Sequence, residues 1–359
     1  MIASSRLELT AYEARALVDR RLAQITPEQQ PVRAPGQRPL AMLIGGPPGS
    51  GKSTTQWLLQ ASLGPGTVAV YDFDDDITAH PRYDAIMRAR GILAADDIAR
   101  SLPPGMIRRC LEHLRRGTPQ YDVIASAPLH RPELARGWVD GFRDVDYRVA
   151  LVYVVTHEAN CRLGRAGRYQ QAVDDTGIGR WVPPERGRLA YRLVPGTAQT
   201  IESESSVDDL YIVDRDGYVW YESHRGADGL IPEPWLAEQQ ILALRNLPPT
   251  PAEDELFHAS AQPLLDRSAE LPQWVVAEVE AAVTQHEARG RPQSHGLVLP
   301  GRLDERLTDL RRITGAGLAA PSATPNPDAG AGAGPGGAGA GSRPGAARPR
   351  SVGGGVREP

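Results

Sequence analysis

Lysine is nearly absent from this chain of 359 residues: of its 40 basic residues only Lys52 is a lysine, and the others are arginines. Cysteine is also scarce, and Cys110 and Cys161 are too few for a disulfide framework and form no metal-binding pattern. Such scarcity is typical of a reducing compartment. The formal net charge of −4 provides no overall attraction to nucleic acid or to anionic lipid. We therefore expect a cytoplasmic protein that binds neither nucleic acid nor membranes.

Long apolar runs are missing as well. The longest strongly apolar stretch, residues 149–155, is far shorter than the roughly 20 residues that a membrane helix needs. Residues 1–9 contain no basic stretch followed by an apolar core, which is the pattern of a secretory signal peptide. We therefore expect neither Sec-dependent export nor a membrane-spanning segment.

The single lysine closes a glycine-rich segment with the spacing of a phosphate-binding loop. A compact ammonium group and a planar guanidinium are not interchangeable in a tight loop, which explains a lysine in a chain that otherwise uses arginine. Apolar residues 40–44 and the helical spacing over 54–62 predict the strand-loop-helix context that the motif requires. The residues that we expect to hold the nucleotide are Gly46, Pro47, Pro48, Gly49, Ser50, Gly51, Lys52, Ser53 and Thr54.

This loop predicts ATP and Mg²⁺ as cofactors. Backbone N–H groups would surround the phosphates, Lys52 would neutralise the β- and γ-phosphates, and the Ser53 hydroxyl would bind Mg²⁺. A guanine-specific GTPase would need an Asn-Lys-x-Asp motif, and hence a second lysine that the sequence does not contain. Adenine is therefore the expected base, although no motif reads it directly.

The remaining pattern predicts an α/β fold. Apolar strands at 67–71, 121–125 and 147–155 alternate with helical segments, which implies right-handed crossovers and a mostly parallel sheet flanked by helices, as in P-loop NTPases. Residues 208–213 and 218–221, joined by an Asp-Arg-Asp-Gly turn, predict a hairpin at the edge of that sheet.

The composition changes along the chain predict four parts. A leading helix over 5–24 precedes a Pro- and Gln-rich linker, and helical spacing returns at 272–289 and 301–313. The last segment is rich in Ala, Gly and Pro and has almost no large apolar side chains, so we expect it to be disordered. The expected parts are an N-terminal helix and linker (1–37), a P-loop domain (38–230), a helical extension (231–314) and a disordered tail (315–359).

A cluster of acidic residues directly follows the strand expected at 67–71. Ligands of open α/β sheets bind at the carboxyl ends of the strands. Asp74 can there accept a hydrogen bond from an attacking hydroxyl, and Asp72 can hold Mg²⁺ through water. His80, which is followed by a proline, can shape the adjoining loop toward a substrate. A solvated acidic turn and a structural histidine are the alternatives.

Arginines recur after the strand at 147–155. Arg162, Arg165 and Arg168 follow at helical spacing, and Arg180 comes twelve residues after the last of them. Arginines on a mobile lid can neutralise the charge of a transferring phosphoryl group, and the lid can exclude water. In so arginine-rich a chain, a solvated helix face is the alternative.

The order of these motifs resembles the zeta toxin family of small-molecule kinases. The resemblance covers about residues 38–222, with 209–217 similar to the family's terminal strand and turn. The segments that carry it are the phosphate loop, Tyr-Asp-Phe-Asp at 71–74, His80-Pro81, Tyr-Asp-Val-Ile at 121–124, the strand at 147–155, Leu163-Gly164 and Arg168-Tyr169.

This resemblance implies transfer of the γ-phosphate of ATP to a sugar hydroxyl of UDP-N-acetylglucosamine, which starves peptidoglycan synthesis. It also implies an antitoxin protein as a partner. Carried over residue by residue, Asp74 is the catalytic base, Lys52 is the loop lysine, and Arg168 and Arg180 are the lid arginines.

The sequence departs from the family pattern on the acceptor side. At the strand end where the family carries a Walker-B-like acid, in Val-Ile-Glu-Gly, this sequence reads Val123-Ile124-Ala125-Ser126. A substrate-side arginine is replaced by His130, and an acid expected on a helix has no clear counterpart in 107–112. Mg²⁺ would then rely on Ser53, Asp72 and water. Two alternatives therefore stay open: a kinase for another acceptor, such as an antibiotic, a nucleotide cofactor or a metabolite, and an ATP-binding module without phosphotransfer.

Overall fold

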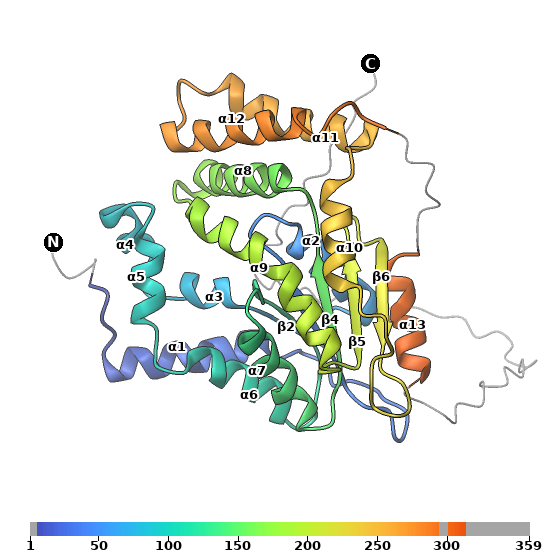
Figure 1. The fold of residues 1–359 in the computed structure, drawn as a ribbon. Coiled ribbons are helices and arrows are strands. Elements are labelled where there is room, and N and C mark those ends of the chain that lie inside the picture. The colour runs from blue at the N-terminus through green and yellow to red at the C-terminus, as the bar shows by residue number, and fades with distance from the viewer. Residues whose placement is uncertain (1–5, 294–300, 314–359) are drawn as a thin grey trace, which may run out of the picture. The chain divides into compact units, whose positions relative to one another are not determined.

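Strands of the central sheet run through the middle of the computed structural model, which describes residues 6–293 and 301–313 (Figure 1). The strands are β1 (Leu40–Gly45), β2 (Val68–Asp72), β3 (Asp122–Ser126), β4 (Arg148–Val154), β5 (Asp209–Val213) and β6 (Val219–His224). Their spatial order is β2-β3-β1-β4-β5-β6, and only β6 pairs antiparallel with its neighbour. The predicted α/β fold, with its mostly parallel sheet and edge hairpin, is confirmed.

Helices connect and cover the strands. Within the described residues they are α1 (Ala11–Ile25), α2 (Lys52–Leu63), α3 (Phe73–Thr78), α4 (Tyr83–Arg90), α5 (Ala94–Ser101), α6 (Met106–Arg116), α7 (Pro132–Arg143), α8 (Glu158–Thr176), α9 (Pro184–Ser203), α10 (Ala237–Asn246), α11 (Pro251–Asp266), α12 (Gln273–Glu287) and α13 (Leu303–Ile313). The strand β1 is followed by a loop and then by α2, as the phosphate-loop motif requires.

The sheet has an apolar core on each face, because alternate residues of a strand point to opposite sides. In β1, Leu40, Met42 and Ile44 belong to the core shared with α2 and α13. Ala41 and Leu43 belong to the opposite core, which α1, α6, α7, α9 and α10 cover. Burial on both faces explains why this central strand is apolar at every position.

One helix boundary differs from the sequence expectation. The helical stretch predicted over 94–116 is two helices, α5 and α6, separated by a turn that contains Pro103 and Pro104. Proline has no backbone N–H and disfavours helical geometry in the residue before it, so α5 ends at Ser101. Gly105 then adopts the left-handed conformation, with a φ of 72°, and begins α6.

The N-terminal helix is tied to the acidic segment after β2. Thr10 and Glu13 form a capping box at the start of α1, so the helix begins later than predicted. Arg21 of α1 donates from Nε to the fully buried carboxylate of Asp76 at 2.9 Å, and the Tyr71 hydroxyl donates to the same carboxylate at 2.8 Å. One of the clustered acids is therefore structural.

Beyond residue 230 the described part of the chain is mainly helical, as predicted. The helices α11 and α12 pack against α8 through an apolar cluster that includes Leu163, Phe257 and Val275 (Figure 1). The predicted tail, residues 315–359, lies outside the described residues. In the described part of the chain, no helix has both the length and the apolar character that crossing a membrane demands.

Candidate phosphate-binding and catalytic site

The loop between β1 and α2 is shaped by glycines in conformations that other residues rarely adopt. Gly46, Gly49 and Gly51 have φ values of 139°, 84° and 107°. A Cβ on Gly49 would stand 2.2 Å from the carbonyl oxygen of Cys161 on α8. The tip of the loop thus lies directly against the backbone of α8, and only glycine fits there.

The start of α2 offers the groups that bind an anion. Its N-cap residue, Gly51, supplies no side-chain hydrogen bond, so the first backbone N–H groups of the helix are not capped by a side chain. The Lys52 ammonium points back over the loop, donating to the carbonyl oxygens of Gly46 at 2.9 Å and Pro47 at 3.1 Å. Burial and the positive charge of Arg168 lower the pKa of Lys52 to about 8. The loop residues therefore fit a phosphate group, whose negative charge would lie beside this ammonium.

Asp72 and Asp74 lie at the carboxyl end of β2, but on different elements. Asp72 is the last residue of the strand, and its Oδ1 accepts the backbone N–H of Asp74 at 2.8 Å as the N-cap of α3. Asp74 lies in the first turn of that helix, so the two carboxylates are not alternate residues of one strand. This cap fixes the position of Asp74 relative to the sheet.

Ser126, the last residue of β3 and part of the segment that departs from the family pattern, contacts the same aspartate. Asp72 and Ser126 are register partners of the parallel pair β2–β3, and the Ser126 hydroxyl donates to Asp72 Oδ2 at 2.9 Å. Sequence reasoning treated Ser126 as a loss and did not foresee this contact. One sequence signal could have predicted this contact: a hydroxyl residue ends one strand and an acidic residue ends the neighbouring strand.

The carboxylate of Asp74 faces both arginines of the expected lid. Arg180 Nη1 is 2.5 Å from Asp74 Oδ1, and Arg168 Nη1 is 4.0 Å from Asp74 Oδ2. Burial raises the pKa of Asp74, but Arg180, Arg168 and Lys52 outweigh it and hold the pKa below its usual range. The structure therefore brings four of the predicted residues together in one charged group.

His80 is not part of that group. Its side chain is buried, Nε2 lies 3.1 Å from the carbonyl oxygen of Leu7, and Nδ1 accepts the backbone N–H of Arg82 at 3.2 Å. Burial lowers the pKa of His80, which favours the neutral ring. Both ring nitrogens therefore contact the chain itself, a geometry that suits a structural role better than the predicted substrate contact.

Two of the arginines on α8 hold the helical extension. Arg162 Nη1 and Arg165 Nη2 lie 3.2 and 3.0 Å from the two carboxylate oxygens of Glu278 on α12. All three side chains are at most 8% exposed. Since Glu278 is 113 residues from Arg165 in sequence, no local spacing could reveal this pairing.

The residue after Arg180 is anchored by aromatic contacts. Trp181 lies with its ring centroid 5.8 Å from that of Tyr169 on α8 and 4.3 Å from that of Trp274 on α12. The extension thus helps to place Arg180 opposite Asp74. Sequence analysis missed the role of Trp274, because it lies almost a hundred residues away.

A pocket of about 330 Å³ lies beside the start of α2. One wall carries Trp57 and Leu58, and the other is the turn between β5 and β6. Arg215 of this turn would be 3.4 Å from a Cβ on Gly51, so the pocket adjoins the phosphate loop. The lining residues are Thr54, Thr55, Trp57, Leu58, Arg215, Asp216, Gly217 and Arg302.

Comparison with known proteins finds a family model and relatives that match this chain. The family model for zeta toxin matches residues 23–225. The zeta toxins of Streptococcus agalactiae and Enterococcus hirae are both 22% identical to this chain, over 52% and 58% of its length. These alignments span 64% and 72% of the two relatives, so the first is matched over less than two thirds of its length.

A solved structure also shares the fold. It comes from the PezAT chromosomal toxin-antitoxin system of Streptococcus pneumoniae, with a TM-score of 0.58 and 17% identity. The similarity covers 73% of this chain and 98% of that structure. Sheet order, phosphate loop and this likeness define a P-loop protein with an α/β fold.

Because the family match spans more than half of the sequence, the chain belongs to the zeta toxin family. The resemblance inferred from the motifs is confirmed. The roles of the individual site residues stay predictions.

Proposed function

We propose that this protein is an ATP-dependent phosphotransferase that phosphorylates a hydroxyl group of a small molecule, with UDP-N-acetylglucosamine or a related nucleotide sugar as the first acceptor to test. The observation that carries the proposal is the position of the Asp74 carboxylate, between Arg180 and Arg168 and close enough to the Lys52 ammonium to influence its pKa. A carboxylate beside three cations suits a reaction in which a hydroxyl approaches a phosphoryl group.

The residues would divide the work of phosphoryl transfer. Lys52 and the N–H groups of the loop would hold the phosphates of ATP, and Arg168 and Arg180 would neutralise charge on the transferring group. Asp74 would orient the acceptor hydroxyl and accept its proton. A low pKa is compatible with this role, because a loose transition state needs little proton abstraction before the phosphoryl group departs.

Mg²⁺ would supply further neutralisation of the phosphates when bound. Ser53 and Asp72 are the residues that would hold it, directly or through water. The hydrogen bonds from Ser126 and from the backbone of Asp74 keep the Asp72 carboxylate in one orientation, and each oxygen retains a lone pair for an ion or its water. The pocket walled by Trp57 and Leu58 would accommodate the base of the nucleotide.

The acceptor is the part of this proposal that needs the widest test. Ser126 and His130 differ from the family pattern, which favours an antibiotic, a nucleotide cofactor or another metabolite as the second candidate. The test is incubation of the protein with ATP, Mg²⁺ and either UDP-N-acetylglucosamine or a metabolite extract, followed by mass spectrometry for the gain of one phosphate. Transfer only to a compound without UDP would overturn the first acceptor and support the second.

Substitution of Asp74 tests the catalytic proposal itself. Asp74→Asn should lower kcat by about 100-fold or more and leave ATP binding intact. Asp75→Asn is the matched control, because Asp75 lies in the same helical turn but 60% of its side chain is exposed. Equal turnover by Asp74→Asn and the wild type would remove Asp74 from this role. ATP binding without any transfer by the wild type would instead favour the non-catalytic module.

We also propose an antitoxin partner and a cytoplasmic setting. One structural neighbour of this chain belongs to a system described as toxin-antitoxin, and an active kinase of this kind would need to be held in check in the cell that makes it. Growth arrest on expression of the wild type, with normal growth on expression of Asp74→Asn, would support this proposal. Equal growth with both would contradict it.

A further inference from the structure

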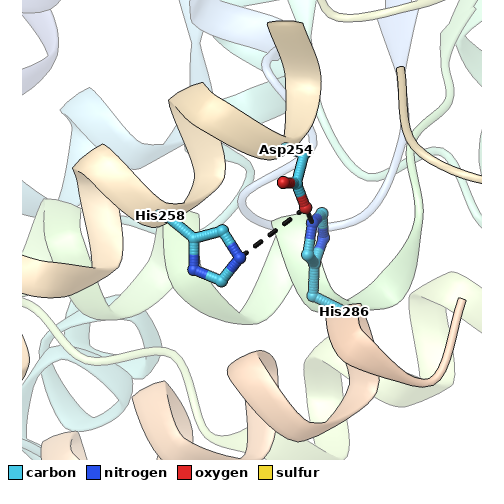
Figure 2. A group of neighbouring side chains, drawn as sticks. All are labelled: Asp254, His258 and His286. Atoms are coloured by element: carbon cyan, nitrogen blue, oxygen red, sulfur yellow. Dashed lines mark hydrogen bonds and ion pairs between the residues drawn. The ribbon is translucent and has the colours of Figure 1, made fainter. Parts of the chain in front are cut away.

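Three metal-ligating side chains converge outside the phosphate site, where α11 meets α12. Asp254 and His258 lie one helical turn apart on α11, and His286 approaches them from α12 (Figure 2). The donor atoms of the three side chains all lie within 4.8 Å of one another. Nε2 of His286 is 2.9 Å and Nε2 of His258 is 3.6 Å from Oδ1 of Asp254.

His286 is fixed in place before any ion binds. Its side chain is 1% exposed, and its ring stacks on Phe257 with 3.9 Å between centroids and 4° between planes. Its Nδ1 is buried and has no hydrogen-bond partner among the described residues. Hydrogen bonding within the chain therefore leaves the polar atoms of this ring incompletely satisfied.

The other two ligands are accessible from solvent. Half of the His258 side chain and 31% of the Asp254 side chain are exposed, so an ion can enter and His258 can turn toward it. Zinc binds nitrogen and oxygen at about 2.0 to 2.2 Å, which donor atoms this close can reach after a side-chain movement on the order of 1 Å. The neighbouring Arg289 is paired with Glu253 at 2.7 Å, which offsets the positive charge beside the cluster.

We propose that Asp254, His258 and His286 form a binding site for a divalent transition-metal cation, with Zn²⁺ as the preferred ion. Two imidazoles and one carboxylate suit Zn²⁺, whereas Mg²⁺ and Ca²⁺ prefer oxygen ligands alone. Three protein ligands leave a fourth position for water. The bound ion would join α11 to α12 and so stabilise the extension that holds α8.

The test uses the full chain without a histidine tag, freed of metal by a chelator. Calorimetric titration with Zn²⁺ should give one site per chain with micromolar or tighter affinity, and the melting temperature should rise. Co²⁺ should give the visible absorption of a four-coordinate site. His258→Ala, which removes a half-exposed ligand, should weaken Zn²⁺ binding by about 100-fold or more and abolish the rise in melting temperature.

His224→Gln is the matched control, since His224 is also about half exposed but lies on β6. It should bind Zn²⁺ like the wild type. Asp254→Asn is the second variant, to be used if His258→Ala does not fold, and it should weaken binding in the same way. Wild-type affinity in His258→Ala or in Asp254→Asn, or the absence of a stoichiometric site in the wild type, would overturn the proposal.

Discussion

Gly164 of α8 and Gly49 of the phosphate loop touch backbone to backbone: a Cβ on Gly164 would stand 2.8 Å from the Gly49 carbonyl oxygen. Contacts this short do not occur, so an alanine at this position must displace either the loop or the helix. The geometry of the loop is therefore set partly by a helix that begins more than a hundred residues later in the chain.

Gly164→Ala is expected to weaken ATP binding by roughly 10-fold or more, because the displaced loop aims its N–H groups poorly at the phosphates. Gly167→Ala is the control on the same helix, where a Cβ would meet nothing within 4 Å. Nucleotide titrations of both variants measure the effect. If they bind ATP equally well, the loop tolerates the displacement and does not depend on the close approach of α8.

Glu278→Ala is expected to destabilise the protein by about 3 to 5 kcal/mol, because the buried guanidinium of Arg165 loses its anion and that of Arg162 keeps only Glu158, at 3.4 Å. Denaturant unfolding measures this change in free energy. Glu280→Ala, at an exposed position of the same helix, should change it by less than about 0.5 kcal/mol. A small effect of Glu278→Ala would mean that water or another group can replace the carboxylate.

Ser126→Ala is expected to raise the Mg²⁺ concentration needed for half-maximal activity by roughly 10-fold, which corresponds to the loss of one hydrogen bond to a charged group. The reason is that the Asp72 carboxylate would no longer be held from the β3 side. A role in folding alone would change stability without moving the Mg²⁺ requirement. Ser62→Ala, which removes an exposed hydroxyl bonded within α2, is the control.

ATP affinity is expected to fall as the pH rises above about 8, the pKa to which burial and Arg168 lower Lys52. In the free protein the lysine is then increasingly neutral, whereas bound phosphates favour its charged form. Binding must therefore take up a proton, and the affinity declines by up to about 10-fold per pH unit. Lys52→Arg keeps its charge in this range, so its weaker binding should not vary with pH. A flat profile for the wild type would contradict the lowered pKa.

The sequence was sufficient to predict the fold and most members of the site, because these features depend on short-range patterns. Alternating apolar strands and helices indicate the parallel sheet, and the glycine spacing around Lys52 indicates the loop. Pro103 and Pro104 also indicate a break in the helix over 94–116, but the helical spacing on either side of them suggests one continuous helix.

The parts that could not be predicted depend on contacts between distant segments. His80 occupies a motif position, yet its ring contacts Leu7 and Arg82, which only the position of the N-terminal segment decides. Arg162, Arg165 and Arg168 recur every three residues on α8, yet the first two pair with Glu278, whereas Arg168 and the more distant Arg180 face Asp74. Spacing alone cannot assign such partners, since it does not say what packs against a helix.

The pairing of Glu278 with α8 also limits how far this P-loop core can be treated as a portable module. The family match ends at residue 225, whereas the acid that neutralises Arg162 and Arg165 lies on α12, well beyond that boundary. A gene fusion or a recombination event that exchanged only the C-terminal part would therefore leave Arg165 without its carboxylate partner and Arg162 with Glu158 alone. The core and its extension are expected to be inherited together, and homologues that lack α12 should carry smaller or uncharged side chains at the two arginine positions.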